Sequence, residues 1–167
     1  MKGFIALWIG GVLVVAFGLS VQAAWATPAS GVTATPIVDG QLGEAIPLEL
    51  MPDGVSRGLL GSSVSTEVEK VSVVRFVGEP GASFGWHQHG GPLWAVITEG
   101  ALTLYHGNDP QCRPTVYQAG SAFLDPGDHT HLARNEGSGQ VEVLVTFMLP
   151  SDGALRIDAP DPGVCAF

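Results

Sequence analysis

The sequence predicts an all-β protein that folds as one antiparallel sandwich or barrel. From about residue 46 onward, short apolar or alternating runs are separated by clusters of Gly, Pro, Asn and Asp. The runs recur roughly every 8–12 residues, which is the strand spacing of such folds. The length of 167 residues suits one domain with a short extension. After residue 26, only Ser65–Lys70 has a pattern that allows a short helical turn.

Ten runs have the length and pattern of β-strands. The breaks between them have ordinary turn chemistry, since Gly78–Gly81 and Gly107–Pro110, for example, both combine glycine with proline. The predicted strands are, in order, Pro47–Glu49, Lys70–Val77, Phe84–His89, Leu93–Thr98, Ala101–His106, Thr115–Gln118, Ser121–Leu124, His131–Asn135, Val141–Leu149 and Leu155–Asp158.

The first 26 residues have the layout of a secretory signal peptide. Lys2 precedes an uncharged apolar run from Gly3 to Leu19, and residues 24–26 (Ala-Trp-Ala) provide a small-x-small cleavage site. This layout predicts export to the periplasm or the extracellular space. An uncleaved N-terminal membrane anchor is the alternative, because 17 apolar residues lie near the lower limit for a membrane span.

The rest of the chain divides into three parts by composition. Residues 27–45 are rich in Thr, Pro, Ala and Gly and have no periodicity. They are predicted to form a flexible N-terminal arm, which is either a tether or an arm along a sheet edge. Residues 46–160 contain the strands of the barrel, and residues 161–167 form a C-terminal tail.

The charge balance excludes one class of partner. The chain has 16 acidic and 7 basic residues, a net charge of −9, and loss of Lys2 with the signal peptide makes it more acidic. The sequence contains no cluster of Lys and Arg. A surface of this charge repels phosphate backbones, so we expect no nucleic-acid partner. Anionic membrane surfaces are disfavoured for the same reason.

The two cysteines, Cys112 and Cys165, are predicted to form a disulfide because the chain is predicted to be exported. The bond would close a loop of about 54 residues, which the chain-entropy model values at roughly 4 kcal/mol. It would tie the tail, residues 161–167, to the barrel. Metal thiolates fit less well, since neither cysteine is near the histidine stretches and no Cys-x-x-Cys pair is present.

Three histidines predict a metal site. His87 and His89 are two residues apart on a predicted strand, so they share one face at a separation of about 7 Å. A third, His131, comes from a distant predicted strand. Imidazoles that converge in this way form a compact nitrogen cluster, and neutral imidazole is a common ligand of iron, zinc, copper and nickel.

The two histidine stretches resemble the two motifs of the cupin superfamily. The first motif is Gly, five residues, His-x-His, three or four residues, Glu, six residues, Gly. The second is Gly, five residues, Pro-x-Gly, two residues, His, three residues, Asn. The resemblance covers residues 81–135 and implies a single cupin jelly-roll β-barrel with a metal at its centre. The matching residues are Gly81, His87, His89 and Gly100 in the first motif, and Gly120, Pro126, His131 and Asn135 in the second.

The chain departs from the family pattern where a carboxylate is expected. Leu93 occupies the position of the glutamate in the first motif, and leucine cannot bind a metal. Glu99 is six residues further along, about 20 Å in extended chain, which is too far to replace it. Asp125 and Asp128 flank the turn before His131 and are expected to shape it; Asp128 itself replaces a motif glycine. His129 is a possible additional site residue, and its alternative is a solvated turn histidine.

The neighbours of the histidines predict an apolar mouth to the site. Leu93, Ala95 and Ile97 alternate along one strand, on the face where the glutamate is missing, and are expected to line the pocket. Phe123 and Phe147 are expected to lie in the ordinary core.

A divalent cation held by three neutral histidines keeps its full charge and up to three open coordination positions. Such a site suits Fe(II), Zn, Cu or Ni better than Mn or Mg, which favour oxygen ligands. Three-histidine members of the superfamily include thiol and diketone-cleaving dioxygenases. The resemblance therefore implies a metal-dependent oxidoreductase that acts on a small molecule, and the N-terminal layout adds that it is exported. The alternatives are a non-catalytic module that binds a metal or small ligand, and a metal-free structural barrel. A homodimer is also expected, since barrels of this kind often pair at their edges.

Overall fold

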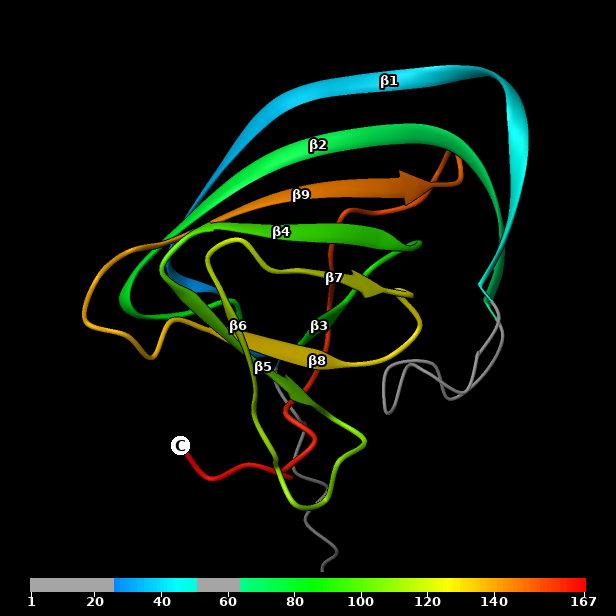
Figure 1. Cartoon of the computed structure of the whole chain (residues 1–167). Coiled ribbons are helices and arrows are strands. Elements are labelled where there is room, and N and C mark those ends of the chain that lie inside the picture. The colour runs from blue at the N-terminus through cyan, green and yellow to red at the C-terminus, as the bar shows by residue number, and fades with distance from the viewer. Residues whose placement is uncertain (1–25, 51–63) are drawn as a thin grey trace, which may run out of the picture.

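The computed structural model describes residues 26–50 and 64–167, and every regular element in these two ranges is a β-strand (Figure 1). The predicted signal peptide, residues 1–26, lies outside the described residues except for Ala26. Among the described residues, no helix has the length and apolar character needed to cross a membrane.

Antiparallel strands form a nearly closed barrel, in agreement with the predicted all-β class. The strands are β1 (Ser30–Leu50), β2 (Val64–Ser83), β3 (His87–Gln88), β4 (Leu93–Glu99), β5 (Ala101–His106), β6 (Thr115–Gln118), β7 (Ala122–Asp125), β8 (His131–Arg134), β9 (Val141–Leu149) and β10 (Ile157–Asp158).

The barrel has two walls. One wall runs β1, β2, β9, β4 and β7 as hydrogen-bonded neighbours, and the other contains β3, β8, β5 and β6, with β10 beside β3. The walls join where Ser83, at the end of β2, pairs with Arg134 of β8. Figure 1 shows the first wall as an arch over the second. Side chains that point into this space form the core.

Strand β9 shows how the sequence pattern produces that core. Side chains alternate between the two faces of a strand, so every second residue of β9 points into the barrel. The inward residues Val141, Val143, Val145, Phe147 and Leu149 are buried, whereas the residues between them are only half-buried. The same alternation in β4 buries its own inward side chains beside those of β9.

The edge of the first wall differs from the predictions. Residues 30–45, predicted to be either a tether or an arm along a sheet edge, belong to β1. This strand lies along the edge of the sheet and pairs with β2. Most of β1 is exposed on both faces, so its sequence needs no alternation of apolar and polar residues. The prediction of a short helical turn at Ser65–Lys70 is wrong, because this segment is part of β2 and pairs with Gln41–Glu49.

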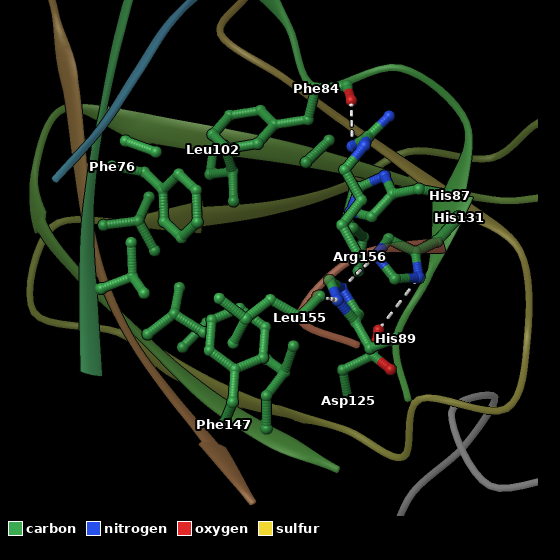
Figure 2. A pocket seen from close by; sticks show the side chains of 18 of the residues that line it. Phe76, Phe84, His87, His89, Leu102, Asp125, His131, Phe147, Leu155 and Arg156 are labelled. Carbon is green, nitrogen blue, oxygen red and sulfur yellow. Dashed lines mark hydrogen bonds and ion pairs between the residues drawn. The ribbon is translucent and has the colours of Figure 1, made fainter. Parts of the chain in front are cut away.

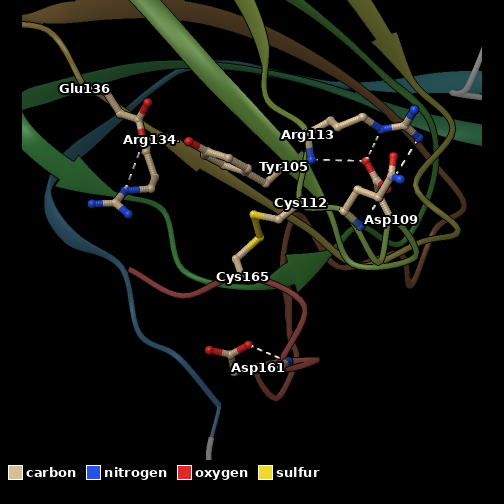
Figure 3. Close-up of a disulfide and its surroundings, with 10 residues drawn as sticks. Tyr105, Asp109, Cys112, Arg113, Arg134, Glu136, Asp161 and Cys165 are labelled. Carbon is tan, nitrogen blue, oxygen red and sulfur yellow. Dashed lines mark hydrogen bonds and ion pairs between the residues drawn. A yellow bond between two sulfur atoms is a disulfide. The ribbon is translucent and has the colours of Figure 1, made fainter.

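The predicted disulfide between Cys112 and Cys165 is present, with Cα atoms 5.3 Å apart (Figure 3). Both cysteines pack against a second, smaller apolar cluster outside the barrel interior. The C-terminal Phe167 lies against Tyr105, with 5.0 Å between ring centroids. The tail is therefore held to the outer side of the second wall. The buried members of this cluster are Trp86, Tyr105, Leu132 and Ala159.

Candidate metal centre

Strand pairing brings the three predicted ligands together. His87 of β3 and His131 of β8 are direct cross-strand partners, and His89 directly follows β3. The ring centroids are 4.4 Å apart for His87 and His131, 4.8 Å for His87 and His89, and 5.0 Å for His89 and His131. Strand β3 is shorter than the predicted Phe84–His89 because Gly85 has a φ of 69°, which interrupts the extended backbone.

Each of the three rings is oriented by an oxygen acceptor at Nδ1. Nδ1 of His87 lies 2.7 Å from the carbonyl oxygen of Gly85, and Nδ1 of His89 lies 2.5 Å from that of Leu155. Nδ1 of His131 lies 3.3 Å from the carbonyl oxygen of His129. A carbonyl oxygen can only accept, so the proton of each neutral ring is assigned to Nδ1. Nε2 of each ring is then unprotonated and carries a lone pair that can bind a metal.

The geometry of these Nε2 atoms suits a cation. Nε2 of His89 lies 3.2 Å from Nε2 of His131, and one ligand nitrogen from each of the three rings lies within 4.8 Å of the others. Two lone pairs that face each other at this distance repel, and a cation between them would turn the repulsion into coordination. The donor set therefore fits a transition metal that prefers nitrogen ligands.

Burial keeps the three rings neutral. It lowers the pKa of His87 to about 2, that of His89 to about 4 and that of His131 to about 3. In each case the loss of water around the ring is the main cause, and the charge of a neighbouring histidine adds to it. A neutral imidazole is the form that binds a metal, so the cluster is ready for a cation at neutral pH.

Asp125, which the sequence analysis expected only to shape a turn, has a second contact. Its Oδ1 accepts a hydrogen bond from the backbone N–H of Gly127 at 2.6 Å, as expected of a turn residue. Its Oδ2 is buried, accepts no hydrogen bond from the described residues, and lies 3.1 Å from Nδ1 of His131. Asp125 is also the cross-strand partner of Leu93. A carboxylate thus stands directly opposite the position where the first motif lacks one.

His129 does not line the cavity with the other three. Its Nε2 lies 3.1 Å from Nδ1 of His106, and its Nδ1 lies 3.1 Å from the carboxylate of Asp128. Its ring centroid is 5.8 Å from that of His131. A ligand atom of His129 also lies within 4.8 Å of one from His131 and one from Asp125, so His129 is next to the cluster.

A cavity of about 330 Å³ opens from the three rings into the barrel (Figure 2). Leu93 and Ala95 line it, as predicted, whereas Ile97 is fully buried in the core and does not reach it. Phe123 and Phe147, expected in the ordinary core, also line the cavity. Other apolar lining residues include Val74, Phe76, Leu102, Leu104, Val143 and Val145.

Arg156 is a lining residue that the sequence analysis did not single out. It follows Leu155, whose carbonyl oxygen orients His89. Its Nη1 donates to the carbonyl oxygen of Phe84 at 2.6 Å, and its Nε donates to the carboxylate of Asp158 at 2.5 Å. These two contacts hold a guanidinium beside the histidine rings (Figure 2). The sequence gives no signal for this, because the segment meets the site only after folding.

A family model described as a cupin domain matches residues 74–147, a range that contains both histidine stretches. Residues 74–147 are therefore assigned to the cupin family. The predicted resemblance is therefore confirmed, and the all-β barrel agrees with it. No curated protein matches the sequence.

Several solved structures are similar to parts of this chain. The polyketide cyclase RemF from Streptomyces resistomycificus is 18% identical, with 81% of this chain and 78% of that chain covered and a TM-score of 0.50. The cupin domain of an XRE family transcriptional regulator from Enterobacter cloacae is 16% identical, with 72% and 99% covered and a TM-score of 0.45. An oxalate oxidase is 24% identical with a TM-score of 0.43, over 47% of this chain and 42% of that chain. This chain thus spans less than half of that oxidase, and these similarities concern the fold alone.

Proposed function

We propose that this cupin is an exported metal-dependent oxidoreductase of the dioxygenase type, and that it acts on a small, partly apolar molecule. One observation carries the proposal: one ligand nitrogen from each of His87, His89 and His131 lies within 4.8 Å of the other two, beside the apolar cavity. Lone pairs in this arrangement favour a bound cation, and the cavity offers space for a ligand beside it.

His87, His89 and His131 would hold the metal, which we expect to be Fe(II), Zn, Cu or Ni because the donors are imidazole nitrogens. A redox-active metal in this position supplies electron transfer to oxygen and vacant positions for substrate. The protein supplies the rest. The carbonyl oxygens that accept from Nδ1 of His87 and His89 fix the directions of those two rings, and the apolar wall excludes water.

In this proposal Asp125 replaces part of the missing charge of the glutamate. Its carboxylate lies beside Nδ1 of His131, on the side of the ring away from Nε2. The negative charge of a carboxylate in that position would favour the proton on Nδ1 and make Nε2 a stronger donor. Asp125 would therefore act through His131 without touching the metal, as a positioning residue.

Export and partners belong to the same proposal. The disulfide between Cys112 and Cys165 is stable in an oxidising compartment, and the N-terminal sequence has the layout of a signal peptide, with a membrane anchor as its alternative. We expect a small-molecule partner and no nucleic acid, because the chain is strongly acidic. A homodimer through the exposed sheet is also expected.

A non-catalytic module that binds a metal or small ligand is the second candidate. One observation favours it: among the described residues that line the cavity, none is a serine, threonine, cysteine, lysine or tyrosine. All chemistry at the site would then depend on the metal. Tight ligand binding without turnover would identify this function.

Metal content and oxygen uptake test the proposal together. Protein isolated from its exported compartment should contain about one transition metal per chain, and His89→Ala should lose it while His106→Ala keeps it. Oxygen uptake is then measured with thiols, diketones, phenolics and organic acids. Uptake with one class, lost in His89→Ala, supports the oxidoreductase. A stoichiometric metal without any uptake favours the binding module, and a protein without metal contradicts the oxidoreductase and the metal-binding form of the module.

A further inference from the structure

The cavity separates polar from apolar lining. Its polar side chains gather at one end, and Figure 2 shows Phe76 and Leu102 on the other side of the space. Phe147 also lines the cavity, with its ring centroid 5.4 Å from that of His89. A ligand that fills it must therefore have one polar end and a hydrocarbon body. The polar lining residues are His87, His89, His131, Asp125 and Arg156.

The volume limits the size of that ligand. The cavity measures about 330 Å³. An apolar cavity of about 150 Å³ holds one benzene molecule. The cavity in this barrel is roughly twice as large, so it accommodates a body of about 8–12 non-hydrogen atoms.

Arg156 has donors left to bind the polar end. A guanidinium has five N–H groups. Three are engaged, by the carboxylate of Asp158, by the carbonyl oxygen of Phe84 and, at 3.5 Å, by that of Thr27. Two N–H groups remain without a partner among the described residues. The engaged groups hold the guanidinium in place, so the free ones are pre-oriented.

The formal charges at this end favour an anion. With the divalent metal of the proposed function, the positive charges are two on the metal and one on Arg156. Asp125 and Asp158 supply one negative charge each, and an imidazole that binds a metal through one ring nitrogen adds no charge. One positive charge remains, which a monoanion balances. The second charge of a dianion would lie either against the hydrocarbon lining or at the polar end, where it would exceed the one remaining positive charge.

We propose that the ligand is an apolar monoanion, namely a medium-sized monocarboxylate or enolate whose oxygen end faces Arg156 and the three histidines. Its hydrocarbon body lies among Phe76, Leu102 and Phe147. This inference rests on the proposed function, since the metal contributes to the charge balance. Arg156 is the specificity-determining residue, because its planar donors match the two oxygens of a carboxylate.

A matched ligand series tests the inference. Zn(II)-loaded protein is titrated calorimetrically with octanoate, 1-octanol and octanedioate, which share chain length and differ in charge. We expect octanoate to bind at least about tenfold more tightly than either of the others, because a charge-assisted hydrogen bond contributes about 1.5–3 kcal/mol. Equal affinity for octanol or octanedioate would overturn the inference.

Variants assign the discrimination to Arg156. Arg156→Gln should lower the affinity for octanoate about tenfold or more and leave the affinity for octanol unchanged. Arg156→Lys should keep part of the preference for octanoate over octanol. Arg113→Gln is the matched control, because Arg113 is an exposed arginine that pairs with Asp109 away from the cavity. An equal loss of octanoate and octanol affinity in Arg156→Gln would contradict the inference.

Zinc content separates this inference from the function on which it rests. It is measured for every variant, and Arg156→Gln should keep the zinc of the unaltered protein. If the unaltered protein holds no metal, the proposed function fails. If zinc is held but octanoate has no advantage over octanol, only the ligand inference fails.

Discussion

Two groups of histidines lie side by side in this barrel, and they differ in the direction of their lone pairs. In the pair His106 and His129, Nδ1 of one ring faces Nε2 of the other at 3.1 Å, and Nδ1 of His129 faces Asp128. Each N–H donor named here has an acceptor, so these contacts need no cation; we call His106 and His129 the complete pair. In the cluster of His87, His89 and His131, every Nδ1 faces an oxygen, and Nε2 lone pairs face each other. The direction of the ring-nitrogen lone pairs, and not only the distance between the rings, distinguishes a candidate metal site from a hydrogen-bonded pair.

The largest expected effect comes from removal of a cluster ring. His87→Ala should abolish stoichiometric metal binding, because two imidazoles hold a divalent cation far more weakly than three. His106→Ala, in the complete pair, should leave the metal content unchanged. Elemental analysis of purified protein measures both. Equal metal loss in the two variants would remove the distinction between the groups.

The next effect concerns the carboxylate beside the cluster. Asp125→Asn keeps the side-chain oxygen that accepts from Gly127 but removes the charge next to His131. We expect metal affinity to fall about 10–100-fold, the usual cost of losing such a partner. Asp128→Asn, beside His129, is the control and should change affinity less than about threefold. Competition with a chromophoric chelator gives both values, and similar losses would show that the charge of Asp125 has no special role.

Acid should destabilise the metal-free protein through the same rings. The pKa values of His87, His89 and His131 are lowered to about 2, 4 and 3, below the ordinary 6.5 of an unfolded histidine. Above pH 6.5 the rings are neutral in both states. As the pH falls below 6.5, the unfolded chain takes up protons first, so stability is lost towards pH 4. At pH 5 the loss is roughly 1–2 kcal/mol per ring.

Urea unfolding at pH 7 and pH 5 measures this loss. A His87→Ala variant should show a smaller decrease between the two pH values than the unaltered protein. An unchanged free energy of unfolding across this range would contradict the burial of neutral rings.

The smallest effect is expected in the complete pair. His129→Gln removes the hydrogen bond to His106 and should cost about 0.5–1.5 kcal/mol of stability without changing the metal content. Thermal unfolding and elemental analysis check the two halves of this expectation. A loss of metal would place His129 in the site, as the sequence allowed.

The sequence predicts the cluster of histidines because its members lie in two local motifs. The spacing of His87 and His89 and the position of His131 after a turn suffice to name the cluster. The strands of the barrel are predicted for the same reason, since alternation along β9 or β4 is a local property. The largest differences in length are in β1 and β2, which pair with each other, and most of β1 is exposed, so its sequence needs no alternation.

What the sequence could not predict depends on register between distant strands. Asp125 stands opposite Leu93 only because β7 pairs with β4, and no local pattern fixes that alignment. Arg156 reaches the cavity because its segment returns to the histidines after about 25 residues of chain from β8. Phe147 lines the cavity for a similar reason: whether an inward residue meets a neighbour or empty space is decided by the whole barrel.

Anomalous diffraction at the absorption edge of the metal found in the isolated protein would locate the cation relative to the three rings. We expect one peak about 2.0–2.2 Å from Nε2 of His87, His89 and His131. A peak between His106 and His129, or coordination through Nδ1 of any cluster ring, would contradict it.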